Sequence, residues 1–121
     1  MEGKKLFHDK LKYKMDEYVS FIYELTKNFL KEEIYGITSQ LRRSSLSVIL
    51  NYIEGFTRNS NKAYKNFLEI SYGSLKESKY LLYFSLKQRY LTKDNYIKAI
   101  KLADEIGAML WKTMEHTTHN T

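Results

Sequence analysis

The chain has 121 residues, 43% of them hydrophobic, and a formal net charge of +6. This length predicts one domain over residues 1–121, built around a single core. No apolar run is long enough to cross a membrane, and the first ten residues lack the apolar stretch of a secretory signal. Because cysteine is absent, disulfides and thiolate metal sites are excluded. We therefore expect a soluble cytoplasmic protein.

Proline is also absent, which favours long helices with short connections, because proline breaks helices and punctuates loops. The first segment with helical periodicity covers about residues 7–29. Its apolar residues recur at spacings of 4 and 3, as in a helix packed against near-parallel neighbours. These residues are Leu11, Met15, Tyr18, Ile22, Leu25 and Phe29.

The second helix, expected over about residues 38–57, has two apolar stripes. Gly36 marks the break before it, and Thr38 is expected to be its N-cap. One stripe consists of Ile37, Leu41, Val48 and Tyr52, and the other of Leu46, Ile49, Leu50 and Ile53. A helix that is apolar on more than one face must bury more than one face. Either this helix is the most central one, or its second stripe meets another subunit.

The third and fourth helices are expected over about residues 61–89 and 93–115, with Ser60 and Thr92 as N-caps. Gly73 lies inside the third helix, where glycine costs about 1 kcal/mol relative to alanine, so we expect a close helix contact as compensation. The polar tail, residues 116–121, is predicted to fray. Four such helices predict an all-α fold, an antiparallel up-down-up-down four-helix bundle. The alternatives are a long three-helix assembly and a helical hairpin that dimerises.

Four blocks of the sequence resemble, in order, those of the four-helix bundle proteins encoded in intervening sequences of bacterial 23S rRNA genes. The blocks are YGITSQLRRSS (35–45), NYIEGFTRNS (51–60), FLEISYGSLKE (67–77) and EIGAML (105–110). The chain departs from the family pattern at Leu30 and Ile49, where proline is usual, and at Ala63, where an acid usually completes a capping box.

The resemblance implies a four-helix bundle that forms a ring-like homopentamer. It extends to the accessory proteins of diversity-generating retroelements, which are basic and contact a reverse transcriptase and nucleic acid. By the same resemblance, structural or interface roles are expected at the positions Tyr35, Gly36, Leu41, Asn51, Glu54, Gly55, Gly73 and Glu77.

The basic excess admits a nucleic-acid or acidic partner, although a lysine-rich solvated face would have the same composition. Candidate nucleic-acid-binding residues are Arg42, Arg43, Arg58, Lys62, Lys65, Lys76 and Lys79. They would suit RNA, DNA or a nucleic-acid enzyme such as a reverse transcriptase. Tyrosines interleave with these cations on the third helix, where they could stack bases or form a subunit interface. The alternative function is a protein-only scaffold whose lysines serve solubility.

Adjacent helix positions diverge by about 100°, so Arg42 and Arg43 are not expected to share one target. One is expected to pair with a carboxylate in the bundle or in a neighbouring subunit, while the other faces phosphate. The candidate carboxylates in the bundle are Glu54, Glu77 and Glu105.

The sequence carries no motif for catalysis. It has no glycine-rich phosphate loop and no serine nucleophile motif. We therefore predict that the protein is not an enzyme and uses no cofactor, small-molecule substrate or membrane. His116 and His119 could bind zinc on a stable helix. Because they lie in the tail that is expected to fray, we predict no metal site.

Overall fold

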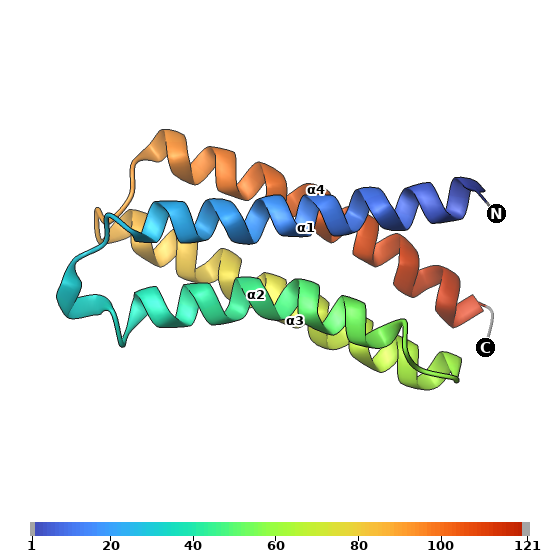
Figure 1. Ribbon diagram of the computed structural model, residues 1–121. Coiled ribbons are helices and arrows are strands. Elements are labelled where there is room, and N and C mark those ends of the chain that lie inside the picture. The colour runs from blue at the N-terminus through green and yellow to red at the C-terminus, as the bar shows by residue number, and fades with distance from the viewer. Residues whose placement is uncertain (1, 120–121) are drawn as a thin grey trace.

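Four long helices form an antiparallel bundle in the computed structural model, which describes residues 2–119 and their side chains as far as residue 117 (Figure 1). The helices are α1 (Glu2–Thr26), α2 (Ile37–Gly55), α3 (Asn61–Lys87) and α4 (Lys93–His119), and a 3-10 helix, η1 (Lys31–Glu33), lies between α1 and α2. Successive helices run in opposite directions, so both ends of the chain lie at the same end of the bundle as the α2–α3 turn (Figure 1). The predicted up-down-up-down bundle is confirmed.

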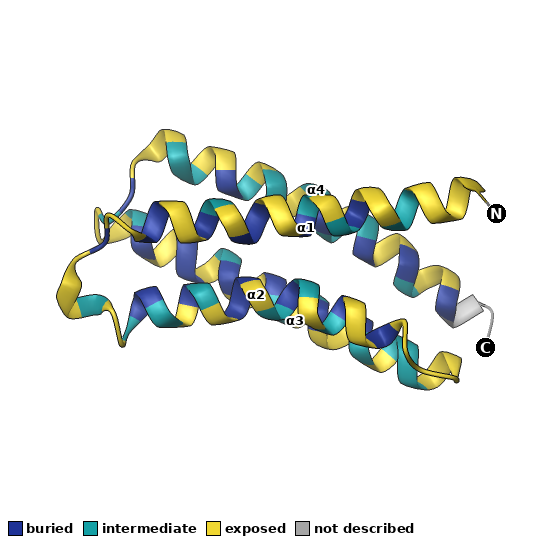
Figure 2. Ribbon diagram, viewed as in Figure 1, coloured by how far each residue is buried: buried dark blue, intermediate teal, exposed yellow. Residues whose placement is uncertain are grey.

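Each helix packs on two neighbours, in the order α1, α2, α3, α4 and back to α1, and the pair α2 and α3 has the most extensive contact. The buried faces turn inward (Figure 2). The core contains, among others, Leu11, Met15 and Ile22 of α1, Leu41, Val48 and Tyr52 of α2, Leu68, Leu75 and Leu82 of α3, and Ala103, Ile106 and Leu110 of α4. Within the described residues, no helix is long and apolar enough to cross a bilayer.

Small residues set the close spacing of α2 and α3. The Ser71 hydroxyl donates to the Val48 carbonyl oxygen at 2.6 Å, and the hydroxyls of Ser47 and Ser74 lie 2.8 Å apart. At the far end of this contact, a Cβ added to Gly55 would lie 3.0 Å from a ring carbon of Tyr64. Larger side chains along this line would push the two helices apart.

The N-caps predicted for α3 and α4 are confirmed. The Ser60 side chain accepts a hydrogen bond from the Ala63 amide at 3.1 Å, and the Thr92 hydroxyl accepts one from the Asn95 amide at 3.2 Å. Each bond satisfies an amide that has no partner within its own helix. These helices begin directly after their caps, at 61 and 93.

The predicted N-cap of α2 is wrong by two residues. α2 begins at Ile37 with Gly36 as the N-cap, and no side chain caps it. Thr38 is buried, and its hydroxyl has no hydrogen-bond partner among the described residues. Cap preference identifies a suitable residue type, but the backbone entering from η1 already takes helical geometry one residue earlier.

The end of α1 also differs from the prediction. α1 runs from Glu2 to Thr26 instead of about 7–29, because the amides of Asn28 and Phe29 each donate to the carbonyl three residues earlier and form a tighter turn. Phe29 is nevertheless buried, and its ring centroid lies 5.6 Å from that of Tyr90. The apolar spacing therefore continues past the helix, and spacing alone does not reveal where the helix stops.

The last two helices end at other residues than expected. α3 ends at Lys87, because Arg89 takes a left-handed φ of 64°. α4 continues to His119, past the predicted end at about residue 115. The fraying predicted for residues 116–121 stays a prediction, and residues 120–121 lie outside the described part. Thr113 and Thr117 are buried against the bundle, and their hydroxyls bond to helix carbonyls.

One hydrogen bond crosses the core between the diagonal helices α1 and α3. Tyr18 is fully buried, and its hydroxyl lies 2.7 Å from that of Ser78. The Ser78 hydroxyl donates to the Leu75 carbonyl oxygen at 2.8 Å. Tyr18 is therefore the donor in the bond that the two side chains share.

Replacing Tyr18 by phenylalanine (Tyr18→Phe) should lower the free energy of unfolding by about 1 kcal/mol, the usual net contribution of such a bond. Ser78 keeps its own acceptor, so no buried donor is left unpaired. Tyr13→Phe is the matched control, because Tyr13 is exposed on the same helix. Urea denaturation measures both, and equal stability of the two variants would contradict the expectation.

Candidate functional site

The second apolar stripe of α2 is only partly covered within the chain. Leu46, Leu50 and Ile53 are 37%, 54% and 45% exposed, and we call these three residues the outer stripe. Ile49, the fourth residue of that stripe, is half-buried and packs against the core. The first stripe of α2 fills the core. The two stripes lie on opposite sides of the helix, so one bundle covers only one of them.

Two residues of α3 extend this apolar surface. Ile70 is exposed, and a Cβ added to Gly73 would have nothing within 4 Å. Both lie beside Ser74, whose hydroxyl bonds to Ser47 of α2. The outer stripe together with Ile70 and Gly73 forms what we call the outer face. Among the described residues, the close helix contact expected at Gly73 is absent.

The two adjacent arginines of α2 have different surroundings. The Arg42 Nε donates to the Thr26 hydroxyl at 2.8 Å, and its guanidinium lies 4.8 Å from the ring centroid of Tyr23, both on α1. Arg43 is exposed and makes no hydrogen bond or ion pair with the described residues. Tyr35, which is 95% exposed, joins both arginines around a shallow pocket of about 410 Å³.

The carboxylates expected near the arginines are dispersed over three helices. Glu54 forms an ion pair with Arg58, one turn further along the chain. Glu105 of α4 accepts a hydrogen bond from the Lys14 ammonium of α1, which holds the pKa of the Glu105 carboxyl below its ordinary value. Glu77 is exposed and has no ion pair in the described part of the chain. The pairing of Arg42 or Arg43 with a glutamate of the same bundle is therefore wrong.

A second group of candidate cations lies at the α2–α3 turn. The Arg58 guanidinium lies 4.7 Å from the ring centroid of Phe67, while Lys62 and Lys65 line a hollow of about 700 Å³ together with Glu69. This turn is separated from Arg43 by most of α2, a helix of 19 residues and about 28 Å in length.

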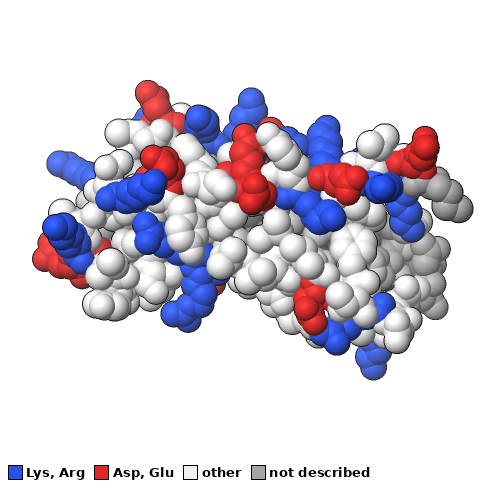
Figure 3. Space-filling model, in the orientation of Figure 1, with Lys and Arg blue, Asp and Glu red and all other residues white. Residues whose placement is uncertain are grey.

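The third group lies on α3 where it faces α4. The Lys76 ammonium is 5.3 Å from the ring centroid of Tyr72, and Lys79 forms an ion pair with Asp104 at 2.6 Å. The Trp111 ring, half exposed, lies 5.7 Å from the Tyr72 ring. The seven candidate nucleic-acid-binding residues thus lie in three separate places on one chain. On the face formed by α1 and α2, cations and carboxylates are interspersed, and the surface over α2 is largely uncharged (Figure 3).

The remaining candidate interface residues take structural positions. Leu41 is fully buried in the core. Asn51 is half-buried, and its amide donates to the Ser47 carbonyl oxygen at 2.9 Å and to the Ser47 hydroxyl at 2.8 Å. A Cβ added to Gly36 would lie 3.0 Å from a carboxylate oxygen of Glu33.

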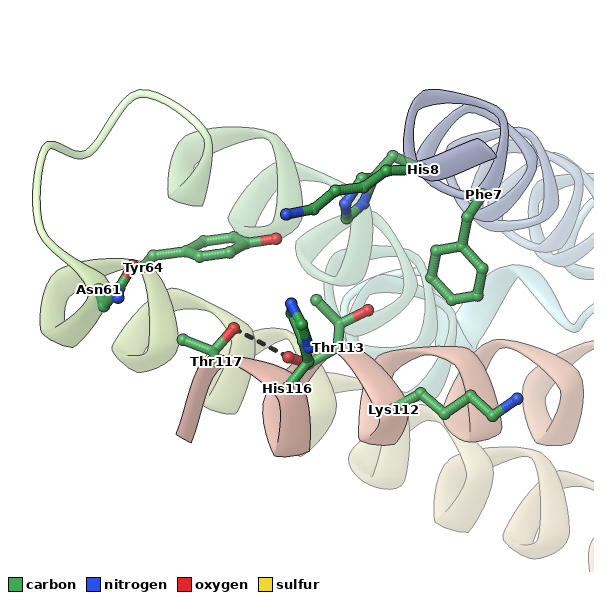
Figure 4. A pocket seen from close by; sticks show the side chains of 9 residues that line it. Phe7, His8, Asn61, Tyr64, Lys112, Thr113, His116 and Thr117 are labelled. Carbon is green, nitrogen blue, oxygen red and sulfur yellow. Dashed lines mark hydrogen bonds between the residues drawn. The ribbon is translucent and has the colours of Figure 1, made fainter. Parts of the chain in front are cut away.

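A pocket at the end of the bundle, near the chain ends, was not expected from the sequence. It has a volume of about 390 Å³, and we call it the end pocket (Figure 4). It is lined by Lys4, Phe7 and His8 of α1, Asn61 and Tyr64 of α3, and Lys112, Thr113, His116 and Thr117 of α4. No sequence signal connects these residues, because they come from three segments with no shared motif.

The described residues contain no group of three or more His, Asp or Glu side chains placed to hold a metal ion. Of the two histidines considered for zinc, His116 lines the end pocket, while the side chain of His119 lies outside the described residues.

A solved structure with the same fold is that of a protein of unknown function from the S23 ribosomal protein family of Bacteroides thetaiotaomicron VPI-5482. The two chains are 23% identical, and the match covers 86% of this chain and 97% of the other with a TM-score of 0.78. At this identity the likeness shows the fold alone. None of the curated proteins matches this chain.

The family model described as 23S rRNA-intervening sequence protein matches residues 10–112. That range includes all four sequence blocks that carry the resemblance and extends from α1 into α4. The chain therefore belongs to the 23S rRNA-intervening sequence protein family.

Proposed function

We propose that this chain is a non-catalytic assembly module. Its copies associate through the outer face, and the assembly presents basic residues to RNA, DNA or a nucleic-acid enzyme. The observation that supports this best is the exposure of the outer stripe, Leu46, Leu50 and Ile53. A ring of five copies, as the family resemblance implies, is the proposed arrangement. The cytoplasmic location stays a prediction.

The outer face has the properties of a protein interface. Covering the outer stripe would remove three large aliphatic side chains per subunit from water, each contributing about 1 kcal/mol, since fully burying one contributes 1.5–3 kcal/mol. The low charge over α2 in Figure 3 suits an interface centre, where charged residues are depleted. Glu77 is exposed and has no ion-pair partner among the described residues, so it is available to a cation of a second copy.

Association would also change what the basic residues can do. Binding a nucleic-acid strand through its phosphates needs several cations along that strand. A single protein chain holds its candidate cations in three separate places. A ring repeats each group once per subunit. Because Arg42 is engaged by Thr26 and Tyr23, Arg43 is the arginine better placed for phosphate, and the exposed ring of Tyr35 offers a surface on which a base can stack.

A protein-only scaffold is the second candidate function. Several of the candidate cations already have partners in the chain: Arg58 pairs with Glu54, and Lys79 pairs with Asp104. A stable oligomer with a co-purifying protein and without salt-dependent nucleic-acid affinity would favour this second function.

Replacing Leu50 by serine (Leu50→Ser) should convert an oligomer at micromolar concentration into monomers. The helix content should stay unchanged, because Leu50 is more than half exposed in the single chain. Leu6→Ser is the control, since Leu6 is an exposed leucine on α1, outside the outer face. Light scattering measures the mass, and circular dichroism measures the helix content. A monomeric wild-type protein would refute the assembly.

Replacing Gly73 by alanine (Gly73→Ala) should have opposite effects on folding and on association. In the monomeric Leu50→Ser background it should stabilise α3 by about 1 kcal/mol, because the added methyl group meets open space. In the wild-type background it should weaken assembly on dilution, because a neighbouring subunit would fill that space. Gly3→Ala, also without neighbours within 4 Å, is the control. Unchanged assembly would mean that no second copy covers Gly73.

Binding to single-stranded RNA, measured by mobility shift, should weaken at least about tenfold between 50 and 200 mM salt, because phosphate contacts release counterions. Arg43→Gln should reduce the affinity and the salt dependence more than Lys101→Gln does, since Lys101 is an exposed lysine of α4 outside the three groups. If neither duplex nor single-stranded nucleic acid binds at low salt, direct contact is ruled out.

A further inference from the structure

We propose that the end pocket binds a nucleoside monophosphate, a ligand that joins an aromatic base to a phosphate dianion. Its volume of about 390 Å³ falls within the usual range for small-molecule sites. Three helices contribute to it, so the folded chain holds the pocket in shape. Such a ligand needs only one subunit, and its binding depends neither on assembly through the outer face nor on polymer binding.

The charge around the end pocket suits an anion. Lys4, His8, Lys112 and His116 line it, and no carboxylate belongs to its described lining. In Figure 4 the His116 ring points up into the pocket, while Lys112 runs along α4 with its ammonium away from Tyr64 and His116. A cleft with basic groups on several sides attracts anions. The two lysine ammonium groups, together with hydrogen-bond donors that carry no charge, suit the several acceptor oxygens of a phosphate better than a single carboxylate.

Tyr64 places an unused hydroxyl in this pocket. The hydroxyl is buried and has no hydrogen-bond partner among the described residues. Figure 4 shows the Tyr64 side chain reaching across from α3 with its oxygen toward the middle of the pocket. Burial raises the pKa of Tyr64 to about 12, so the hydroxyl keeps its proton at neutral pH. A ligand oxygen would give this donor the acceptor that it lacks.

His8 offers a second donor. Tyr52 is fully buried, and its hydroxyl has His8 Nδ1 as its hydrogen-bond partner. Donation from the Tyr52 hydroxyl to Nδ1 leaves no buried O–H unpaired, so Nδ1 is the acceptor. Burial, helped by the charges of Lys4 and Lys12, lowers the pKa of His8, so the ring is neutral at pH 7 and carries its proton on Nε2. His8 lines the end pocket, so its Nε2–H is the donor that this ring can offer to a ligand.

Two aromatic rings provide surface for a base. Phe7 of α1 and Tyr64 of α3 enter the pocket from opposite sides (Figure 4). The Tyr64 ring is held against the end of α2, where a Cβ added to Gly55 would lie 3.0 Å from a ring carbon and the ring of Phe56, directly after α2, lies at 5.6 Å. Stacking on such rings accepts any base. The hydroxyls of Thr113 and Thr117 donate to helix carbonyls at 2.9 and 2.8 Å, so they already have acceptors and are not needed for the ligand.

Isothermal titration calorimetry at fixed salt with adenosine monophosphate, adenosine and inorganic phosphate tests this site. Adenosine monophosphate should bind at least about tenfold more tightly than either part alone, because ring contacts and charge act together. The Leu50→Ser monomer should bind it as well as the wild type does. Loss of RNA binding or of assembly therefore leaves this result intact, and the two proposals fail separately.

Three variants locate the ligand. Tyr64→Phe should weaken binding of adenosine monophosphate several-fold without lowering stability, because the hydroxyl has no partner in the free chain. Lys4→Gln and Lys112→Gln should each weaken it about fivefold or more. Lys5→Gln and Lys101→Gln, which remove exposed charges outside the pocket, should leave it unchanged.

Three results would overturn the proposal. The first is no measurable heat with millimolar adenosine monophosphate. The second is equal affinity for inorganic phosphate, which would make the pocket a simple anion site. The third is an equal loss of affinity in Lys4→Gln and Lys5→Gln, which would show general attraction to a basic protein.

Discussion

A helix in a four-helix bundle can turn only one face to the core, and α2 has apolar residues on two. Leu41 and Val48 occupy the core, while Leu50 on the opposite side of the helix remains in water. The close contact with α3 does not cover the outer stripe. Ser47, Ser71, Ser74 and Gly55 bring α3 against another side of α2 and leave the outer stripe exposed. The exposed face is therefore a property of the bundle geometry, and a second copy of the chain is what we infer to cover it.

The same constraint decides how the charges can be used. On one subunit the basic residues occupy three places, and several of them are already paired with carboxylates or rest on aromatic rings. The net charge of +6 then attracts anions in general, but the basic residues of one subunit form no continuous track for a nucleic-acid strand. Repetition around a symmetric assembly would align equivalent groups, so polymer binding and assembly are linked in this proposal by geometry.

The end pocket has a different origin. It forms where the first turns of α1 and α3 meet the last turns of α4, where Thr113 and Thr117 are buried. Helix ends bring side chains from distant parts of the chain together, which is how Lys4 and Lys112 come to line the same volume. The assembly face proposed along α2 and the ligand site proposed at the end of the bundle would therefore not compete with each other.

The sequence by itself determined the four helices, the caps at Ser60 and Thr92 and the two stripes of α2, because periodicity and capping depend on residues within one or two turns. It did not predict that Thr38 is buried instead of capping α2, or that Arg42 bonds to α1. Nor did the sequence reveal the end pocket around Tyr64, because its lining residues are scattered over three separate segments of the chain. Only the tertiary structure decided these points, because they depend on distances between side chains on different helices, and these distances follow from how the helices pack.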